Sequence, residues 1–432
     1  MKEKMLKKEN RKNIWQRVGI TIGILFFYDL LTYVTIPGID ANALVKLKNN
    51  PTLTMMSTFS GGGFQNLSLL SLGVSAFISA QIITQLLQSG VVPKLTEWGK
   101  QGQVGREKLT QFTRILTIIL GFTQAVGVIA GINELSQYGF IVNDSWWNYF
   151  VIALLMTAGG FIAIWLGDQI TQYGLGNGIS IIIAAGIIKR LPSLTNQFML
   201  SVSTTFGEVK WDLVILTVVI ILALTTLIVW FNCSEYRIQI QYTRRENKTT
   251  ADSYLPLKLL VPGVVPVIFA SSILTIPQTI LLFFQNKQDS SVYRMVNDIF
   301  SLNSTIGTTL YALLIVLFTY LYSLVQIEPD KLAVNLGKQD AYIPEVIPGD
   351  PTALYIKNIL FDLGLPGSMF LVFISVIPLI AANTISSSLQ IGLSGSSLLI
   401  IIGVLTDMGR QIKGLKLRHG YSNFMSKEFA FN

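Results

Sequence analysis

Residue types that usually carry chemistry are scarce in this chain. Its 432 residues include one cysteine, Cys233, and one histidine, His419. A single cysteine excludes an internal disulfide, and a single histidine leaves no material for a His-based metal site or a His-dependent catalytic triad. The glycine-rich stretch Gly174–Gly178 follows an apolar segment instead of a strand and lacks the spacing of a dinucleotide-binding loop. We therefore predict no enzyme, no cofactor and no metal, and we expect these glycines to let helices approach closely.

Composition indicates that the solvent of this protein is a lipid bilayer. Apolar residues make up 51% of the chain and charged residues 13%, and the mean hydropathy is +0.54. A soluble protein of this length does not need so apolar a composition. Since about 20 apolar residues cross roughly 30 Å of hydrocarbon, the chain can supply ten spans. The predicted fold class is an all-α polytopic membrane protein with ten transmembrane helices.

The ten apolar segments begin with an uncleaved first helix, because no small-residue cleavage site follows it. The fifth segment is short and bounded by glycines, so a hydropathy window alone would also fit a re-entrant loop. The segments lie near residues 14–36, 72–87, 112–131, 149–166, 179–188, 213–231, 259–284, 306–325, 356–380 and 393–408.

Cations predict the orientation of the spans, because Lys and Arg near span ends are retained on the cytoplasmic side. With the amino terminus inside, 25 of the 32 Lys and Arg residues are cytoplasmic. Both termini are therefore expected in the cytosol. The seven cations left outside are Lys46, Lys48, Lys189, Arg190, Lys210, Lys287 and Arg294.

Charged residues inside the spans are nearly absent, which separates a conduit from an ion-coupled solute transporter. Asp29, in the first span, is the main exception. It has either a functional partner or a structural one, and a carboxylate that simply lies close to the outer interface is the competing interpretation. Asp168 and Arg114 fall at span ends, where a solvated charge is expected. The solute transporter stays as the alternative from a different class, and substrate-dependent uptake into vesicles would identify it.

Several stretches, taken in their order and spacing, resemble the SecY family, the central subunit of the general protein-export channel. The resemblance covers nearly the whole chain. The stretches are 59–66, 78–80, 101–114 (QGQVGREKLTQFTR), 176–186 (GNGISIIIAAG), 263–272 (GVVPVIFASS) and 396–403.

This resemblance implies two five-helix halves that are related by a pseudo-two-fold axis in the membrane plane and surround a central pore. The amino-terminal half would comprise residues 1–190, with a plug at about 57–70. The carboxy-terminal half would comprise residues 191–432, with cytoplasmic loops at about 236–258 and 326–357. No repeat is visible in the letters themselves.

The family's pore constriction is a ring of aliphatic side chains. A narrow apolar collar excludes water and so blocks ions, while flexible aliphatic side chains can part around a polypeptide. For each residue alone, ordinary apolar packing is the competing interpretation. The ring falls here on Val74, Ile78, Ile179, Ile183, Ile268 and Ile400.

The same resemblance assigns a plug and a lateral gate. Spans two, three, seven and eight would form the gate, with Ser79 and Gln124 on its polar positions. Leu260 departs from the usual bacterial pattern, which has an asparagine there in the seventh span, so the gate is expected to be tuned differently. The plug residues would be Phe59, Ser60, Gly61, Gly62, Gly63 and Phe64, whose glycines ease its movement.

The cytoplasmic loops are where the family docks the ribosome or the SecA-type export ATPase. Cationic loops beside RNA phosphates gain affinity through counterion release, although positive-inside topology alone would place cations there. Ile347 departs from the family, which normally has an arginine important for motor coupling at this position. The matching basic residues are Arg237, Arg244, Arg245 and Lys248.

The function implied is a protein-conducting channel of the bacterial cytoplasmic membrane that passes secretory preproteins and releases membrane helices into lipid. The implied partners are a SecE-like subunit, a SecG-like subunit, the SecA-type ATPase, the ribosome and the lipid bilayer. The departures at Leu260 and Ile347 keep a narrower alternative open. It is the accessory SecY paralogue that some Gram-positive bacteria devote to a few surface glycoproteins.

Overall fold

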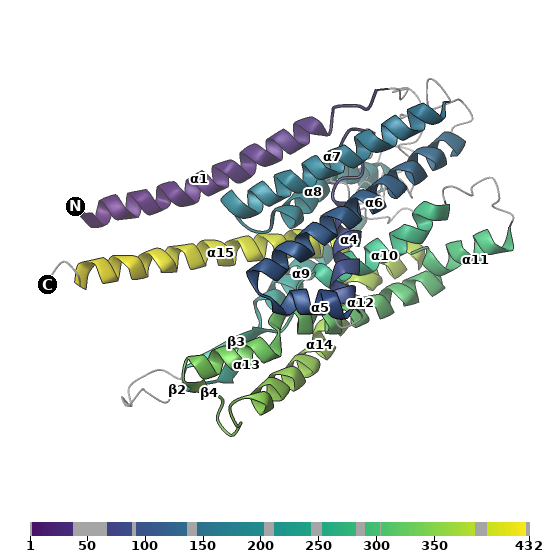
Figure 1. Cartoon of the computed structure of the whole chain (residues 1–432). Helices are drawn as coiled ribbons and strands as arrows, with labels where there is room; N and C mark the ends of the chain where they lie inside the picture. The colour runs from purple at the N-terminus through teal and green to yellow at the C-terminus, as the bar shows by residue number, and fades with distance from the viewer. Residues whose placement is uncertain are drawn as a thin grey trace. The chain divides into compact units, whose positions relative to one another are not determined.

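The computed structural model describes residues 2–37, 67–88, 92–135, 145–202, 211–242, 253–281, 290–302, 304–384 and 395–428. The described chain is mainly helical (Figure 1). It divides into two compact units. Unit 1 comprises residues 1–194, 275–297 and 400–432, and unit 2 comprises residues 195–274 and 298–399.

Unit 1 is built around long helices that pack side by side. Figure 1 shows α1 and α15 projecting from the same end of this unit. Its helices are α1 (Lys2–Leu31), α4 (Ser75–Leu86), α5 (Pro93–Lys100), α6 (Gln103–Leu135), α7 (Trp146–Tyr173), most of α8 (Gly178–Val202), of α11 (Ser291–Phe300) and of α15 (Gly395–Glu428), and the end of α10 (Val265–Leu281).

Unit 2 combines helices with four short strands. The strands form two antiparallel pairs, β1 with β3 and β2 with β4. The elements are α9 (Trp211–Cys233), β1 (Glu235–Gln239), β2 (Gln241–Tyr242), β3 (Tyr254–Lys258), most of α10 (Val265–Leu281), the end of α11 (Ser291–Phe300), α12 (Thr305–Ile327), α13 (Pro329–Lys338), β4 (Ala341–Tyr342) and α14 (Asp350–Thr384).

Every predicted span falls on a helix. Within the described residues, six helices are long and apolar enough to cross a membrane, and α4 and α10 are shorter apolar helices. The fifth span, for which a re-entrant loop was the alternative, lies on α8, a helix of 25 residues. Helices α5, α11 and α13 and all four strands were not predicted.

Glycines let backbone segments meet in the core of unit 1. That core includes Ile152, Ala153 and Met156 of α7, packed against α6 and against the chain just before α4. A side chain at Gly178 would collide with the carbonyl oxygen of Gly167. The start of α8 therefore packs directly on the backbone of α7, as the glycine-rich sequence predicted.

The loop between α7 and α8 is bonded to both α1 and α15. Arg17 donates to the Gly174 carbonyl at 3.3 Å, and the Leu175 N–H donates to Thr21 Oγ1 at 3.1 Å. The N–H of Gly176, whose φ is 75°, donates to Gln411 Oε1. These bonds satisfy backbone groups that neither helix can satisfy itself.

Asp29 has a partner in the structure. Lys189 of α8 forms an ion pair with its carboxylate and donates to Thr32 Oγ1 at 2.8 Å. The ammonium also lies 4.2 Å from the ring centroid of Tyr33. The cluster joins the end of α1 to α8, so a structural role accounts for the carboxylate.

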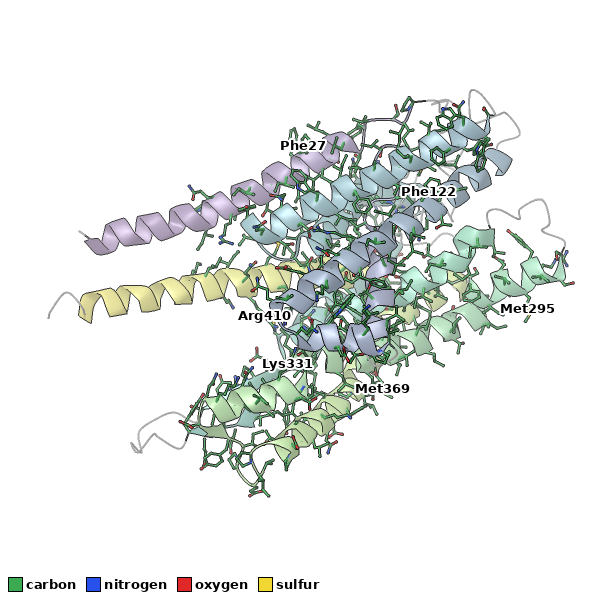
Figure 2. The ribbon with its side chains drawn as sticks, in the orientation of Figure 1. Phe27, Phe122, Met295, Lys331, Met369 and Arg410 are labelled. Carbon is green, nitrogen blue, oxygen red and sulfur yellow. The ribbon has the colours of Figure 1, made fainter. Side chains whose placement is uncertain are left out.

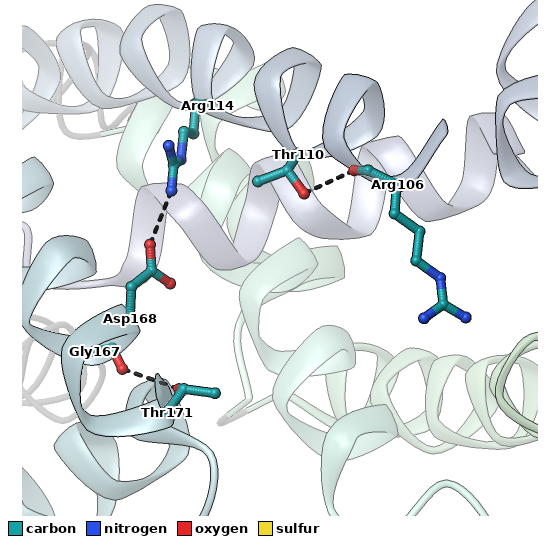
Figure 3. Close-up of polar contacts among 6 residues, drawn as sticks. All are labelled: Arg106, Thr110, Arg114, Gly167, Asp168 and Thr171. Atoms are coloured by element: carbon teal, nitrogen blue, oxygen red, sulfur yellow. Dashed lines mark hydrogen bonds and ion pairs between the residues drawn. The ribbon is translucent and has the colours of Figure 1, made fainter. Parts of the chain in front are cut away.

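Arg114 and Asp168, the two charges expected to be solvated at span ends, also form an ion pair. Their side chains are 3.0 Å apart and 51% and 44% exposed. Figure 3 shows the bond linking α6 to α7. An exposed pair of this kind contributes little stability.

Aromatic rings hold the helices of unit 2 together. Phe231 of α9 stacks on Phe370 of α14 with centroids 3.8 Å apart. Phe269 of α10 meets Phe318 of α12 edge to face at 5.9 Å. These contacts fix α14 against α9 and α10 against α12.

A compact end region of unit 2 contains the strands and α13. Helix α12 stops at Glu328, whose φ is 46°, and Pro329 then starts α13, a position that proline favours. Ile238, Leu257 and Ile343 are among the side chains buried between the strands and the first turns of α14. The strand pairs therefore have a small hydrophobic core of their own.

The Gly178→Ala variant should destabilise unit 1, because its methyl group would overlap the Gly167 carbonyl oxygen. We expect a loss of about 1–3 kcal/mol, measured as a lower thermal unfolding midpoint in detergent. Gly409→Ala in α15 is the control, since an added Cβ there meets nothing within 4 Å. That control should leave the midpoint unchanged or raise it. Equal midpoints for the two variants would contradict the close approach.

A double-mutant cycle on Asp29 and Lys189 should show coupling between them. The side chains are 46% and 30% exposed, so we expect about 0.5–1 kcal/mol from the unfolding midpoints of Asp29→Asn, Lys189→Gln and the double variant. The same cycle on the more exposed pair, Arg114 and Asp168, should give a smaller value. The reverse order would show that the first cluster does not hold α1 to α8.

Candidate functional site

The helices of the second and seventh spans begin with the same backbone turn. Before α4, Gly73 has a φ of 51° and its N–H bonds to the Leu70 carbonyl at 2.9 Å. Before α10, Gly263 has a φ of 59° and its N–H bonds to the Leu260 carbonyl at 3.2 Å. Glycine adopts positive φ without steric cost. A local structure is thus repeated, and the letters repeat with it, since Leu-Leu-x-x-Gly-Val occurs at residues 69–74 and again at 259–264. The expectation that the sequence shows no repeat was wrong at this place.

Ile78 and Ile268, two residues of the predicted ring, each follow one of these glycines by five positions. The Ile78 N–H donates to the Val74 carbonyl at 3.0 Å, and the Ile268 N–H donates to the Val264 carbonyl at 3.3 Å. Both side chains are buried, being 3% and 5% exposed. Ile78 and Ile268 therefore occupy corresponding positions in the two copies of this turn and helix.

The other four ring residues lie at helix starts or within helices. Val74, Ile183 and Ile400 are buried, whereas Ile179 is only half-buried. An added Cβ on Gly167 would lie 3.2 Å from Ile179 Cγ1, so this isoleucine packs against α7. Such burial fits a closed collar and ordinary core packing equally well, and the ring stays a prediction.

Only the last part of the predicted plug, about 57–70, belongs to the described residues, which resume at 67. That part is bonded to the chain after α1. The Leu69 N–H donates to the Val34 carbonyl at 2.9 Å, and the Ile36 N–H donates to the Leu67 carbonyl at 3.3 Å. The predicted plug residues from Phe59 to Phe64 lie outside the described residues.

Non-helical chain passes closely over α7 on its way to α4. A side chain at Gly159 would collide with the Leu69 carbonyl oxygen, and one at Gly160 would lie 3.3 Å from the Gly73 carbonyl oxygen. Two adjacent glycines of α7 thus provide the surface for this segment.

The predicted gate residues lie in three settings. Ser79 is buried in α4 and donates to the Ser75 carbonyl at 3.2 Å. Gln124 is half-buried in α6. Leu260 was expected inside the seventh span, but it precedes α10 and lies in the turn, buried and 3.7 Å from a Cβ placed on Gly367 of α14. An asparagine would put a polar side chain into this apolar contact.

The predicted docking residues are described only in part. Arg237 of β1 stacks over the ring of Tyr254 in β3, with its guanidinium carbon 4.7 Å from the centroid. Ile347 is 73% exposed in the turn before α14, and its carbonyl accepts from Thr352 Oγ1 at 2.9 Å. Arg244, Arg245 and Lys248 lie outside the described residues.

Chemistry-bearing side chains form no further cluster within the part of the chain that the structure describes. There, no group of three or more His, Cys, Asp or Glu residues could hold a metal ion. Cys233 is exposed at the end of α9.

The whole chain is similar to solved structures of protein-conducting channels. "The structure of a protein conducting channel" matches with a TM-score of 0.69 at 17% identity, covering 94% of this chain and 93% of that one. "Sec61 in the Canine ribosome-channel complex from the endoplasmic reticulum" matches with a TM-score of 0.62 at 18% identity, covering 94% and 93%. At these identities the similarity shows the fold.

Sequence similarity is closer to bacterial relatives. Protein translocase subunit SecY 2 of Lactobacillus kefiranofaciens is 58% identical over 95% of this chain and 100% of the relative. SecY 1 of the same organism is 45% identical over 96% and 97%, and SecY of Lactococcus lactis is 40% identical over 96% of each. A family model described as SecY matches residues 68–409. The chain therefore belongs to the SecY family.

Proposed function

We propose that this chain forms the protein-conducting channel of a Sec translocase. It passes unfolded secretory polypeptides across the bacterial cytoplasmic membrane and releases membrane helices sideways into lipid. The observation that carries this function is the SecY match over residues 68–409, with 58% identity to a protein translocase subunit. The family is one of channel subunits and is not a known enzyme family.

Two halves, residues 1–190 and 191–432, surround the pore. The repeated turn before α4 and α10 supports this division, because Gly73 and Gly263 occupy equivalent positions in the second span of each half. If the two halves are an inverted repeat of five helices, each half should contain one copy of this turn and the helix that follows it.

The ring acts as an apolar seal. Water leaves a narrow collar of aliphatic side chains, and ions do not follow a path without water. The corresponding positions of Ile78 and Ile268 after the two repeated turns support this assignment. The plug covers the ring, and α4, α6, α10 and α12 contribute the lateral gate.

Both termini and the strand-bearing region of unit 2 face the cytosol in this proposal, as the distribution of Lys and Arg favours. The apolar windows of α1 and α9 bury only 11% of their residues within the chain. These exposed apolar surfaces suit lipid and a SecE-like companion helix. A SecG-like subunit, a SecA-type ATPase, the ribosome and secretory preproteins complete the proposed partners.

The accessory paralogue is a second candidate, favoured by one observation. Identity to SecY 2 of L. kefiranofaciens is 58%, against 45% to SecY 1 of the same organism. Ile347 is exposed at a position where the SecY family normally has an arginine. An ATPase that docks there would therefore differ from the housekeeping SecA-type ATPase.

Ring substitutions should make the channel leak ions. Ile78→Ser with Ile183→Ser places hydroxyl groups where two branched side chains stood, so water enters the collar and ions follow. The leak should grow when residues 59–70 are deleted as well. Single-channel current in planar bilayers at matched protein amounts measures it.

Two control pairs separate a leak from a packing defect. Ile129→Ser with Ile152→Ser changes buried side chains of α6 and α7 that are not assigned to the ring, and Val219→Ser with Ile220→Ser changes exposed side chains of α9. The buried control should lower the yield of folded protein without discrete conductance. Ring variants with the plug deleted that conduct no more than these controls would overturn the ring assignment.

Ile347→Arg should raise translocation driven by a housekeeping SecA-type ATPase, since it restores the missing cation at an exposed position. A reconstituted assay with preprotein, motor and vesicles measures the rate. Val334→Arg, on an exposed residue of α13, controls for added charge. An accessory motor should gain little from Ile347→Arg. Unchanged translocation rates with both motors would show that residue 347 has no part in motor coupling.

A further inference from the structure

A groove on unit 2 is lined by two aromatic rings and a carboxylate. Tyr320 of α12 and Phe361, Asp362 and Leu365 of α14 line an open hollow of about 540 Å³. The two ring centroids are 5.7 Å apart with the planes tilted by 30°. A Cβ on Gly364 would lie 2.6 Å from Tyr320 Cε1, so the missing side chain leaves room for the tyrosine ring.

Asp362 offers hydrogen-bond acceptors without a cation to neutralise them. It is exposed, and it enters none of the ion pairs found among the described residues. Two carboxylate oxygens are thus available at one residue. The complementary ligand is a cation that carries N–H donors.

The charge pattern of α14 would place the groove at the boundary between hydrocarbon and lipid headgroups, if the hydrocarbon begins after Asp362 and not at the start of the predicted span at 356. Residues 363–380 contain no charge and would rise about 27 Å as a helix, close to the roughly 30 Å of a hydrocarbon core. Asp362 immediately precedes this run. Tyrosine and other aromatic side chains also favour this depth, where one end of a ring meets apolar chains and the other meets water.

A row of exposed apolar side chains continues along α14 from the groove into the apolar run. Its members are Leu365, Met369, Phe373 and Ile377, which are 52%, 64%, 50% and 43% exposed. Figure 2 labels Met369 on this helix. In a bilayer such a row contacts acyl chains, so a headgroup site and a chain path are continuous on one helix.

We propose that this groove binds the headgroup of phosphatidylethanolamine. The primary ammonium lies over the rings of Tyr320 and Phe361 and donates hydrogen bonds to the oxygens of Asp362, while the acyl chains follow the exposed row. A lysine of a partner protein carries the same ammonium. The lipid is favoured because apolar surface continues from the carboxylate toward the middle of the bilayer.

Native mass spectrometry of the purified full-length chain tests the site. Phosphatidylethanolamine and phosphatidylglycerol with identical acyl chains are added together, and the ratio of bound lipids is measured. Phosphatidylethanolamine should be retained in preference, and Asp362→Asn should lower the ratio about fivefold or more. Phosphatidylcholine, a quaternary ammonium without N–H donors, should bind more weakly than phosphatidylethanolamine.

Matched variants show whether a change in the lipid ratio comes from the groove. Asp350→Asn removes an exposed carboxylate from the same helix outside the groove and should leave the ratio unchanged. Tyr320→Leu should also lower the ratio of bound phosphatidylethanolamine to phosphatidylglycerol, with size-exclusion chromatography confirming that the variant is folded. If Tyr320→Leu does not fold, the Asp362→Asn result alone decides the test. An unchanged ratio in Asp362→Asn overturns the proposal. Loss of a co-purifying protein subunit with an unchanged lipid ratio also overturns it, in favour of a partner lysine.

Discussion

Backbone that leaves a helix inside a membrane must find its hydrogen bonds within the protein, because hydrocarbon supplies none. Three non-helical segments of this chain find hydrogen bonds within the protein: the turns before α4, the turns before α10 and the loop between α7 and α8. Each is bonded at short range. The first also bonds to the chain after α1, and the third bonds to α1 and α15. The packing of the neighbouring helices follows from where these segments can pass.

Glycines make this arrangement sterically feasible. Gly159, Gly167 and Gly178 lack side chains where one backbone lies directly on another, whereas Gly73 and Gly263 adopt left-handed φ angles. Two different properties of glycine, small size and conformational freedom, are therefore used at different positions. At Gly159 and Gly178 a larger residue would collide with a carbonyl oxygen, and at Gly73 and Gly263 it would be strained by the positive φ.

The sequence was sufficient to predict the spans, because a run of apolar residues is required by the bilayer wherever the helix packs. It was not sufficient for contacts that depend on tertiary structure. Asp29 was recognised as unusual, but its partner Lys189 is distant in sequence and was counted among the outer cations. The turns at Gly73 and Gly263 were missed although the sequence carries a signal, because Leu-Leu-x-x-Gly-Val occurs both at residues 69–74 and at residues 259–264. So short a match stands out only once the two backbone turns are superimposed. The strands of unit 2 are too short for their alternation to stand out. For the ring and gate, periodicity cannot separate a pore residue such as Ile183 from core neighbours of the same type.

The shortness of α4 has a consequence for the surroundings that this helix requires. With 12 residues and its C-cap at Leu87, α4 rises only about 18 Å, less than the roughly 30 Å of a typical hydrocarbon core. A helix this short cannot face lipid along its whole length without thinning the bilayer, and each ångström of mismatch has an energetic cost. Half of the residues of α4 are instead buried within the protein. Its protein neighbours thus take the place that lipid holds around a longer helix.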